Sequence, residues 1–89
     1  MIRGYVLIET EVGTTQAVGD AVRALRSEFA SILAVDTVTG PYDVIVQVEA
    51  DDLDRLGKTI TNEIATTPGV QRTTTCLSVN LAYERSRSR

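Results

Sequence analysis

The chain has 89 residues, of which 43% are hydrophobic and 24% are charged, and its formal net charge is −3. This composition indicates a single folded domain: it is too apolar for a disordered chain, and no apolar run approaches the roughly 18 residues of a membrane span. Histidine is absent, which removes the commonest general base and the commonest metal ligand, so we expect no catalytic residue, no metal and no cofactor.

The first half of the chain predicts a strand followed by a helix. Residues 2 to 9, IRGYVLIE, are rich in β-branched and aromatic side chains and precede a loop at Gly13. Thr14 is the expected N-cap of the helix. The apolar residues after it have the spacing of one helical face; they are Val18, Ala21, Val22, Leu25 and Phe29.

The second half predicts two strands, a helix and a last strand. Residues 31 to 39 and 42 to 50 are expected to pair as an antiparallel hairpin, because only Gly40-Pro41 separates them. Asp51 and Asp52 are expected to cap the following helix, which ends at TPG before a long strand over residues 70 to 83. Its expected apolar stripe consists of Leu53, Leu56, Ile60 and Ile64.

This β-α-β-β-α-β order predicts an α+β fold, a ferredoxin-like plait with a four-stranded antiparallel sheet and two helices on one face. The strands are apolar on both faces, since Leu33 and Val35 alternate with Ile32 and Ala34. The uncovered face therefore requires a partner, which we expect to be the sheet of a second copy.

The sequence also carries a single cysteine, a carboxylate inside an apolar strand and a basic C-terminus. The single cysteine, Cys76, lies inside the apolar alternation TTTCLSVNL and is expected to be a small buried hydrophobe. Asp36 lies inside an apolar strand, where we expect a bulge or an interface contact. Residues 84 to 89, ERSRSR, are expected to form a disordered basic tail after a domain spanning residues 1 to 83.

The charge and the N-terminus bear on partners and location. Without the tail the domain is more acidic, and an acidic surface repels phosphate, so we expect no direct nucleic-acid binding. Met1 leads directly into the first strand without the features of a signal peptide. We therefore expect a cytoplasmic protein that does not enter a membrane.

Two spaced motifs resemble a known family. The stretches VTGPYDVIVQV and TPGVQRTTTCLSV are similar to the V-x-G-x-Y-D and P-G-V-x-x-T-x-T motifs of the effector-binding (RAM) domain of Lrp/AsnC regulators. The resemblance covers residues 1 to about 82. Full-length members carry an N-terminal helix-turn-helix, whereas Met1 here immediately precedes the first strand, so the chain resembles the stand-alone form of the domain.

The resemblance implies a dimer of the α+β barrel type, which assembles into tetramers or octamers and binds a small effector, typically an amino acid, between dimers. Full-length Lrp/AsnC regulators are further implied partners. Asp43 would accept hydrogen bonds from the ammonium group of the amino acid, while backbone amides and threonine hydroxyls would bind its carboxylate. Pro41 lacks an amide donor, which departs from this scheme. The implied ligand-binding residues are Thr39, Gly40, Tyr42, Asp43, Thr73 and Thr75.

Other interpretations remain open. Gly40-Pro41 also suits a plain turn, Asp43 an acceptor for turn amides, and the threonines a solvated strand. The chain could be a purely structural partner of full-length regulators that binds no effector. An oxygenase of the dimeric α+β barrel type is the best enzyme alternative, although histidine and tryptophan are both absent.

Overall fold

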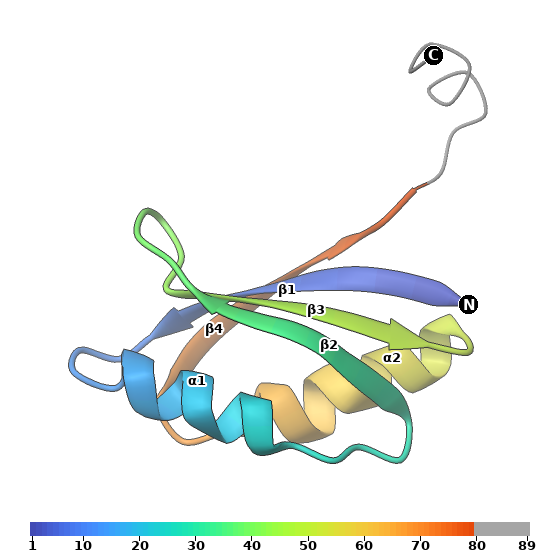
Figure 1. Ribbon diagram of the computed structural model, residues 1–89, viewed down its shortest axis with the longest axis horizontal. Helices are drawn as coiled ribbons and strands as arrows, with labels where there is room; N and C mark the ends of the chain where they lie inside the picture. The colour runs from blue at the N-terminus through green and yellow to red at the C-terminus, as the bar shows by residue number, and fades with distance from the viewer. Residues whose placement is uncertain (80–89) are drawn as a thin grey trace, which may run out of the picture.

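The computed structural model describes residues 1 to 79. The end of the predicted last strand and the basic tail at residues 84 to 89 lie outside the described residues. Figure 1 shows the elements in chain order: β1 (Ile2–Thr10), α1 (Thr15–Ala24), β2 (Ala30–Thr37), β3 (Val44–Ala50), α2 (Leu53–Thr59), a π-helical turn η1 (Ile60–Ile64), and β4 (Val70–Leu77).

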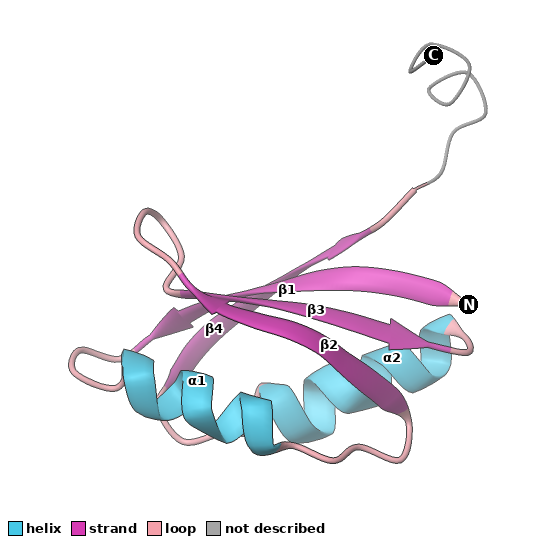
Figure 2. Ribbon diagram, viewed as in Figure 1, coloured by secondary structure: helices cyan, strands magenta, loops and turns pink. Residues whose placement is uncertain are grey.

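The four strands form one antiparallel sheet in the order β2-β3-β1-β4. Both helices lie against the same face of this sheet (Figure 2). The predicted ferredoxin-like plait is therefore confirmed, including the antiparallel pairing of β2 and β3. The connection is longer than predicted, because β2 ends at Thr37 and β3 begins at Val44, so that residues 38 to 43 and not only Gly40-Pro41 separate the strands. The opposite face, which we call the open face, is not covered by any element of the described chain.

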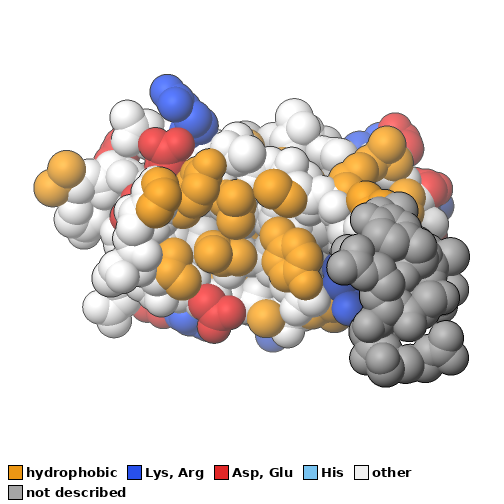
Figure 3. All heavy atoms as spheres, turned by 90° about the horizontal axis from the view of Figure 1, so that it is seen from above, with side chains coloured by type: hydrophobic (Ala, Val, Ile, Leu, Met, Phe, Trp, Pro, Cys, Tyr) orange, Lys and Arg blue, Asp and Glu red, His pale blue; other side chains and the backbone are white. Residues whose placement is uncertain are grey.

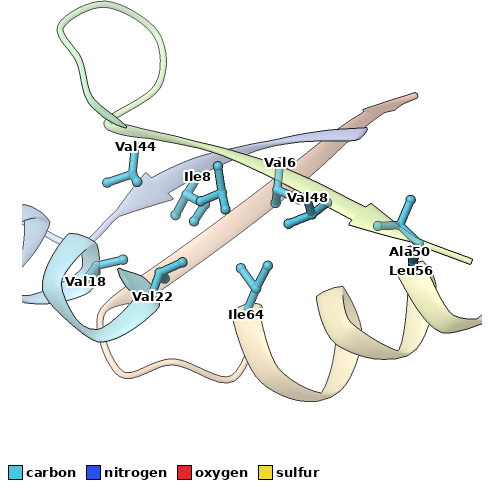
Figure 4. Close-up of a cluster of buried hydrophobic side chains, with 10 residues drawn as sticks. Val6, Ile8, Val18, Val22, Val44, Val48, Ala50, Leu56 and Ile64 are labelled. Carbon is cyan, nitrogen blue, oxygen red and sulfur yellow. The ribbon is translucent and has the colours of Figure 1, made fainter. Parts of the chain in front are cut away.

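The core lies between the sheet and the helices (Figure 4). Alternate residues of β1 and β3 point toward the helices, as the period of two in a strand requires, and Val6, Ile8 and Val46 have no exposed surface. Helix residues complete the same cluster, including Val18 and Ile64. Burying each of these side chains contributes about 1.5–3 kcal/mol to folding.

Helix α1 is shorter than the sequence predicts. It ends at Ala24 because Leu25 adopts an extended backbone with ψ 138°. Phe29, which we expected on the helix, therefore lies in the loop before β2, where its ring centre is 5.6 Å from Lys58 Nζ. The Ser27 hydroxyl stabilises this loop by accepting the Phe29 N–H and hydrogen-bonding to Thr59. Ala21, expected on the buried face, is exposed.

Helix α2 begins as predicted but changes pitch. The Asp52 side chain accepts the Arg55 N–H at 2.8 Å and caps the helix. Beyond Thr59 the backbone is π-helical, and the Ala65 N–H donates to the Ile60 carbonyl five residues back. The predicted apolar stripe is partly confirmed, since Leu56 and Ile64 are fully buried. Leu53 is 55% exposed, however, and Thr59, which is not part of the predicted stripe, is fully buried.

The prediction for Cys76 is wrong for the single chain. Cys76 is exposed, because it pairs with Tyr5 on the open face and no element of the described chain covers that face. Asp36 is also exposed and pairs with Ile45. The irregularity in β2 falls earlier in the strand, between Ile32 and Ala34, so Asp36 marks no bulge.

The open face is apolar at its centre (Figure 3). Tyr5 is 38% exposed and Leu33 is 44% exposed. Leu7 and Ile45 pair across β1 and β3, one row further along the sheet. A contiguous apolar patch of this kind is typical of a surface that contacts another protein.

The buried cluster makes a direct prediction about stability. Ile8→Ala removes a fully buried side chain, so the free energy of unfolding should fall by about 2–5 kcal/mol. Urea denaturation at one fixed protein concentration measures this loss. Val12→Ala is the control, because Val12 is 103% exposed and its truncation should cost less than about 0.5 kcal/mol. Equal losses in both variants would contradict the described core.

Candidate functional site

The loop between β2 and β3, residues 38 to 43, is the β2–β3 hairpin loop. It projects away from the helices, beyond the open face of the sheet (Figure 1). The Val38 N–H closes the loop by donating to the Asp43 carbonyl at 2.9 Å. Gly40 has φ 130°, a conformation that side chains disfavour, and no atom outside its chain neighbours lies within 4 Å of the position of a Cβ. The backbone at Gly40 is therefore accessible to a ligand or to another chain.

Asp43 is the most strongly constrained residue of the loop. Its N–H donates to the Ile8 carbonyl at 2.8 Å. Its Oδ2 atom accepts hydrogen bonds from the Thr10 N–H at 2.8 Å and from the Thr10 hydroxyl at 3.1 Å. Among residues 1 to 79, no hydrogen bond to Oδ1 is formed. The half-buried carboxylate thus uses one oxygen within the fold and leaves the other for a partner.

Thr10 and Thr15 are the residues that sequence reasoning missed. The Thr10 hydroxyl lies 2.8 Å from the Thr15 hydroxyl, and Thr15 is the first residue of α1. Thr10 ends β1 and Thr15 begins α1, and because threonine is common in strands, the Thr10 hydroxyl does not stand out in the sequence. The β1–β3 register, which brings the end of β1 beside Asp43, is the signal that identifies them.

The second motif forms another constrained corner. Gly69 has φ 96°, and a Cβ there would lie 2.8 Å from Val18 Cγ2 and 2.9 Å from Thr14 Cβ. Its carbonyl accepts the Glu11 N–H at 2.9 Å and the Thr14 hydroxyl at 3.3 Å. Thr14 is the N-cap residue, as predicted, but its hydroxyl donates to carbonyls instead of accepting a helix N–H. Both motifs therefore contact the β1–α1 segment, residues 10 to 15.

The structure does not bring all the predicted site residues together within one chain. Thr73 and Thr75 pair with Ile8 and Val6, so they lie on the helix-covered side of β4. Since β1 separates β4 from β3, they are about 10 Å from β3. Thr75 lines a separate groove of about 350 Å³ between β4 and α2. Gly40, Tyr42 and Asp43 share the hairpin loop with the exposed Thr39.

Within residues 1 to 79, no cluster of three or more His, Cys, Asp or Glu side chains has an arrangement suited to a metal ion. Over the same residues, no helix is long and apolar enough to cross a membrane.

Known proteins provide an independent comparison. The family model described as the Lrp/AsnC ligand binding domain matches residues 3 to 87. TTHA0845 from Thermus thermophilus is 34% identical, with 91% of this chain and 96% of that chain covered and a TM-score of 0.80. PHS023 from Pyrococcus horikoshii is 29% identical, with 93% and 95% covered and a TM-score of 0.77.

A more distant structure shares the fold alone. The transcriptional regulator NMB0573 from Neisseria meningitidis, solved in complex with L-Met, is 13% identical with a TM-score of 0.76. This chain covers 51% of that longer protein, which in turn spans 91% of this chain. A comparison with curated protein sequences gave no significant match.

The Gly69 corner predicts a large effect from a small substitution. Gly69→Ala should lower the free energy of unfolding by about 2 kcal/mol or more, because the new Cβ requires an unfavourable φ and collides with Val18 and Thr14. Gly57→Ala is the matched control: Gly57 lies in α2, where an added Cβ would meet no atom beyond its own helix backbone within 4 Å, and the substitution should raise stability by about 0.5–1 kcal/mol. Urea denaturation measures both, and similar effects would contradict the packing at Gly69.

Proposed function

We propose, because the chain belongs to the family of Lrp/AsnC ligand-binding domains, that it is a regulatory module that binds an amino acid at the β2–β3 hairpin loop. The module would bind its effector without catalysing a reaction. Acting in the cytoplasm, the module would respond to the concentration of its effector by changing its state of assembly. Contact with DNA would come from full-length regulators of the family that assemble with it.

One observation carries the proposal: the Asp43 carboxylate has an oxygen left for a partner, in the same hairpin loop as the accessible backbone of Gly40. A carboxylate of this kind suits an ammonium group, and a glycine backbone allows close approach of the rest of an amino acid. The L-Met complex of the N. meningitidis regulator, which shares this fold, supports an amino acid as the effector class.

A second copy would complete the site. Thr73 and Thr75 lie on the helix-covered side of β4 and cannot reach the hairpin loop of their own chain, so their hydroxyls would bind the effector's carboxylate only from a neighbouring copy. Dimers would form through the open faces, and tetramers or octamers through contacts between dimers. An effector bound between copies stabilises the oligomer for which it has the higher affinity. The size of this stabilisation is set by the difference between its affinities for the dimer and for the larger oligomer.

A purely structural role is the second candidate. The hydrogen bonds from Thr10 to Asp43 Oδ2 and the left-handed backbone of Gly40 serve the fold itself. They explain both residues without an effector, and the module would then join oligomers of full-length regulators without binding one. The two candidates differ in whether an amino acid binds, and they share the same sheet and loop surfaces.

Native mass spectrometry with each of the twenty amino acids separates the candidates. We expect one amino acid to bind with an affinity between about millimolar and micromolar and to change the proportion of dimers and larger oligomers. Asp43→Asn can still accept the Thr10 N–H but loses the charge, so affinity should fall about 10- to 100-fold.

Asp51→Asn is the matched control, because Asp51 is an exposed carboxylate outside the hairpin loop. It should retain wild-type binding. If no amino acid binds the wild-type protein and its oligomers keep the same masses throughout, the structural role replaces the sensor.

The open face makes a separate prediction about the dimer. Tyr5→Glu adds a charge to the open face and should dissociate the dimer, as measured by sedimentation velocity. Cys76, which pairs with Tyr5, should then react faster with a maleimide, because it is exposed in the single chain. Val12→Glu is the control at an exposed position outside the sheet. Unchanged mass and unchanged labelling in Tyr5→Glu would exclude a dimer through this face.

A further inference from the structure

We infer that Thr10 is a positioning residue for the effector, acting through Asp43, and that Thr15 supports Thr10 in this role. The inference rests on the proposed function, because it concerns the same Asp43 carboxylate and the ammonium group that would bind there. It assigns a function to hydroxyl groups that are outside both sequence motifs.

The geometry fixes Asp43 at three points. Its N–H donates to the Ile8 carbonyl at 2.8 Å, and its own carbonyl accepts the Val38 N–H at 2.9 Å. Its Oδ2 atom accepts the two hydrogen bonds from Thr10 at 2.8 and 3.1 Å. With the main chain and one carboxylate oxygen fixed, the direction of Oδ1 is also determined. An acceptor that is already oriented loses little side-chain freedom when a ligand binds.

The hydroxyl groups of Thr15 and Thr10 form a chain of hydrogen bonds in which each donor can be assigned. An ionised carboxylate only accepts, so the Thr10 hydroxyl must donate its single hydrogen to Asp43. The hydrogen between the two threonine oxygens, 2.8 Å apart, must therefore come from Thr15. Thr15 is the first residue of α1. The chain thus links the start of this helix to the carboxylate in the hairpin loop.

The backbone and the hydroxyl of Thr10 have different consequences. The Thr10 N–H would donate to Asp43 with any residue other than proline at position 10, so this bond alone requires no threonine. The hydroxyl adds a second bond to the same oxygen and restricts rotation of the carboxylate. A variant that removes only the hydroxyl therefore tests the positioning role while the register of the sheet is retained.

Thr10→Val removes the hydroxyl and keeps the branched shape, whereas Thr10→Ser keeps the hydroxyl. The probes are the twenty amino acids, tested singly, and the desamino acid of the one that binds, in which hydrogen replaces the ammonium group. NMR titration gives each affinity. We expect Thr10→Val to weaken binding of the amino acid about tenfold, to change binding of the desamino acid less than about twofold, and Thr10→Ser to restore wild-type values.

Two further variants serve as a control and as a replacement for Thr10→Val. Thr66→Val is the control, because the Thr66 hydroxyl donates only to carbonyls near the end of η1, and it should leave both affinities unchanged. If Thr10→Val does not fold, Thr15→Val serves in its place, since it removes only the distant member of the chain. It should weaken amino-acid binding about two- to threefold and leave binding of the desamino acid unchanged.

The outcomes are distinct. Equal weakening of both probes by Thr10→Val indicates a structural role and overturns the inference, and so does an unchanged affinity for the amino acid. In both cases the proposed function stands. A wild-type protein that binds none of the twenty amino acids refutes the proposed function, and the inference falls with it.

Discussion

The double hydrogen bond from Thr10 to Asp43 Oδ2 is the interaction on which the candidate site depends. It joins the end of β1 to the last residue of the hairpin loop, directly before β3. From the other side, the Gly69 carbonyl accepts the Glu11 N–H and the Thr14 hydroxyl. The two sequence motifs, 26 positions apart from Asp43 to Gly69, therefore stabilise the same short segment between β1 and α1.

This arrangement reconciles the structural and functional interpretations of Asp43. A carboxylate has two oxygens, and the fold uses Oδ2 while Oδ1 accepts nothing among the described residues. A residue can thus stabilise a turn and still offer an acceptor to a ligand. The same holds for Gly40, whose left-handed backbone shapes the loop and whose missing Cβ leaves the backbone accessible.

The fold was predictable from the sequence because its signals are local. Alternation in Val44, Val46 and Val48 indicates a strand with one buried face, and the short GP connection predicts antiparallel pairing. The errors arise where tertiary contacts override the period. Ser27 and Thr59 stabilise a loop where helix was expected, and Thr59 is buried in α2 whereas Leu53 of the predicted stripe is exposed.

The site was only partly predictable. Sequence motifs identify Gly40, Tyr42 and Asp43, which are adjacent in the chain, but not Thr10, whose proximity depends on the register of β1 against β3. They also group the hairpin loop with Thr73 and Thr75, which β1 separates from it within one chain. Cys76 was misplaced for a related reason, since the sequence alone does not reveal which apolar strand face one chain leaves open.

The most direct measurement of the central claim is a ¹H–¹⁵N NMR spectrum of the wild-type protein during titration with each amino acid. The account predicts that one amino acid shifts the amide signals of Gly40, Tyr42 and Asp43 most, together with that of Thr10, which donates to Asp43. Shifts centred instead on the groove between α2 and β4 would contradict the assignment of the site. The absence of shifts with all twenty amino acids would contradict an amino-acid sensor.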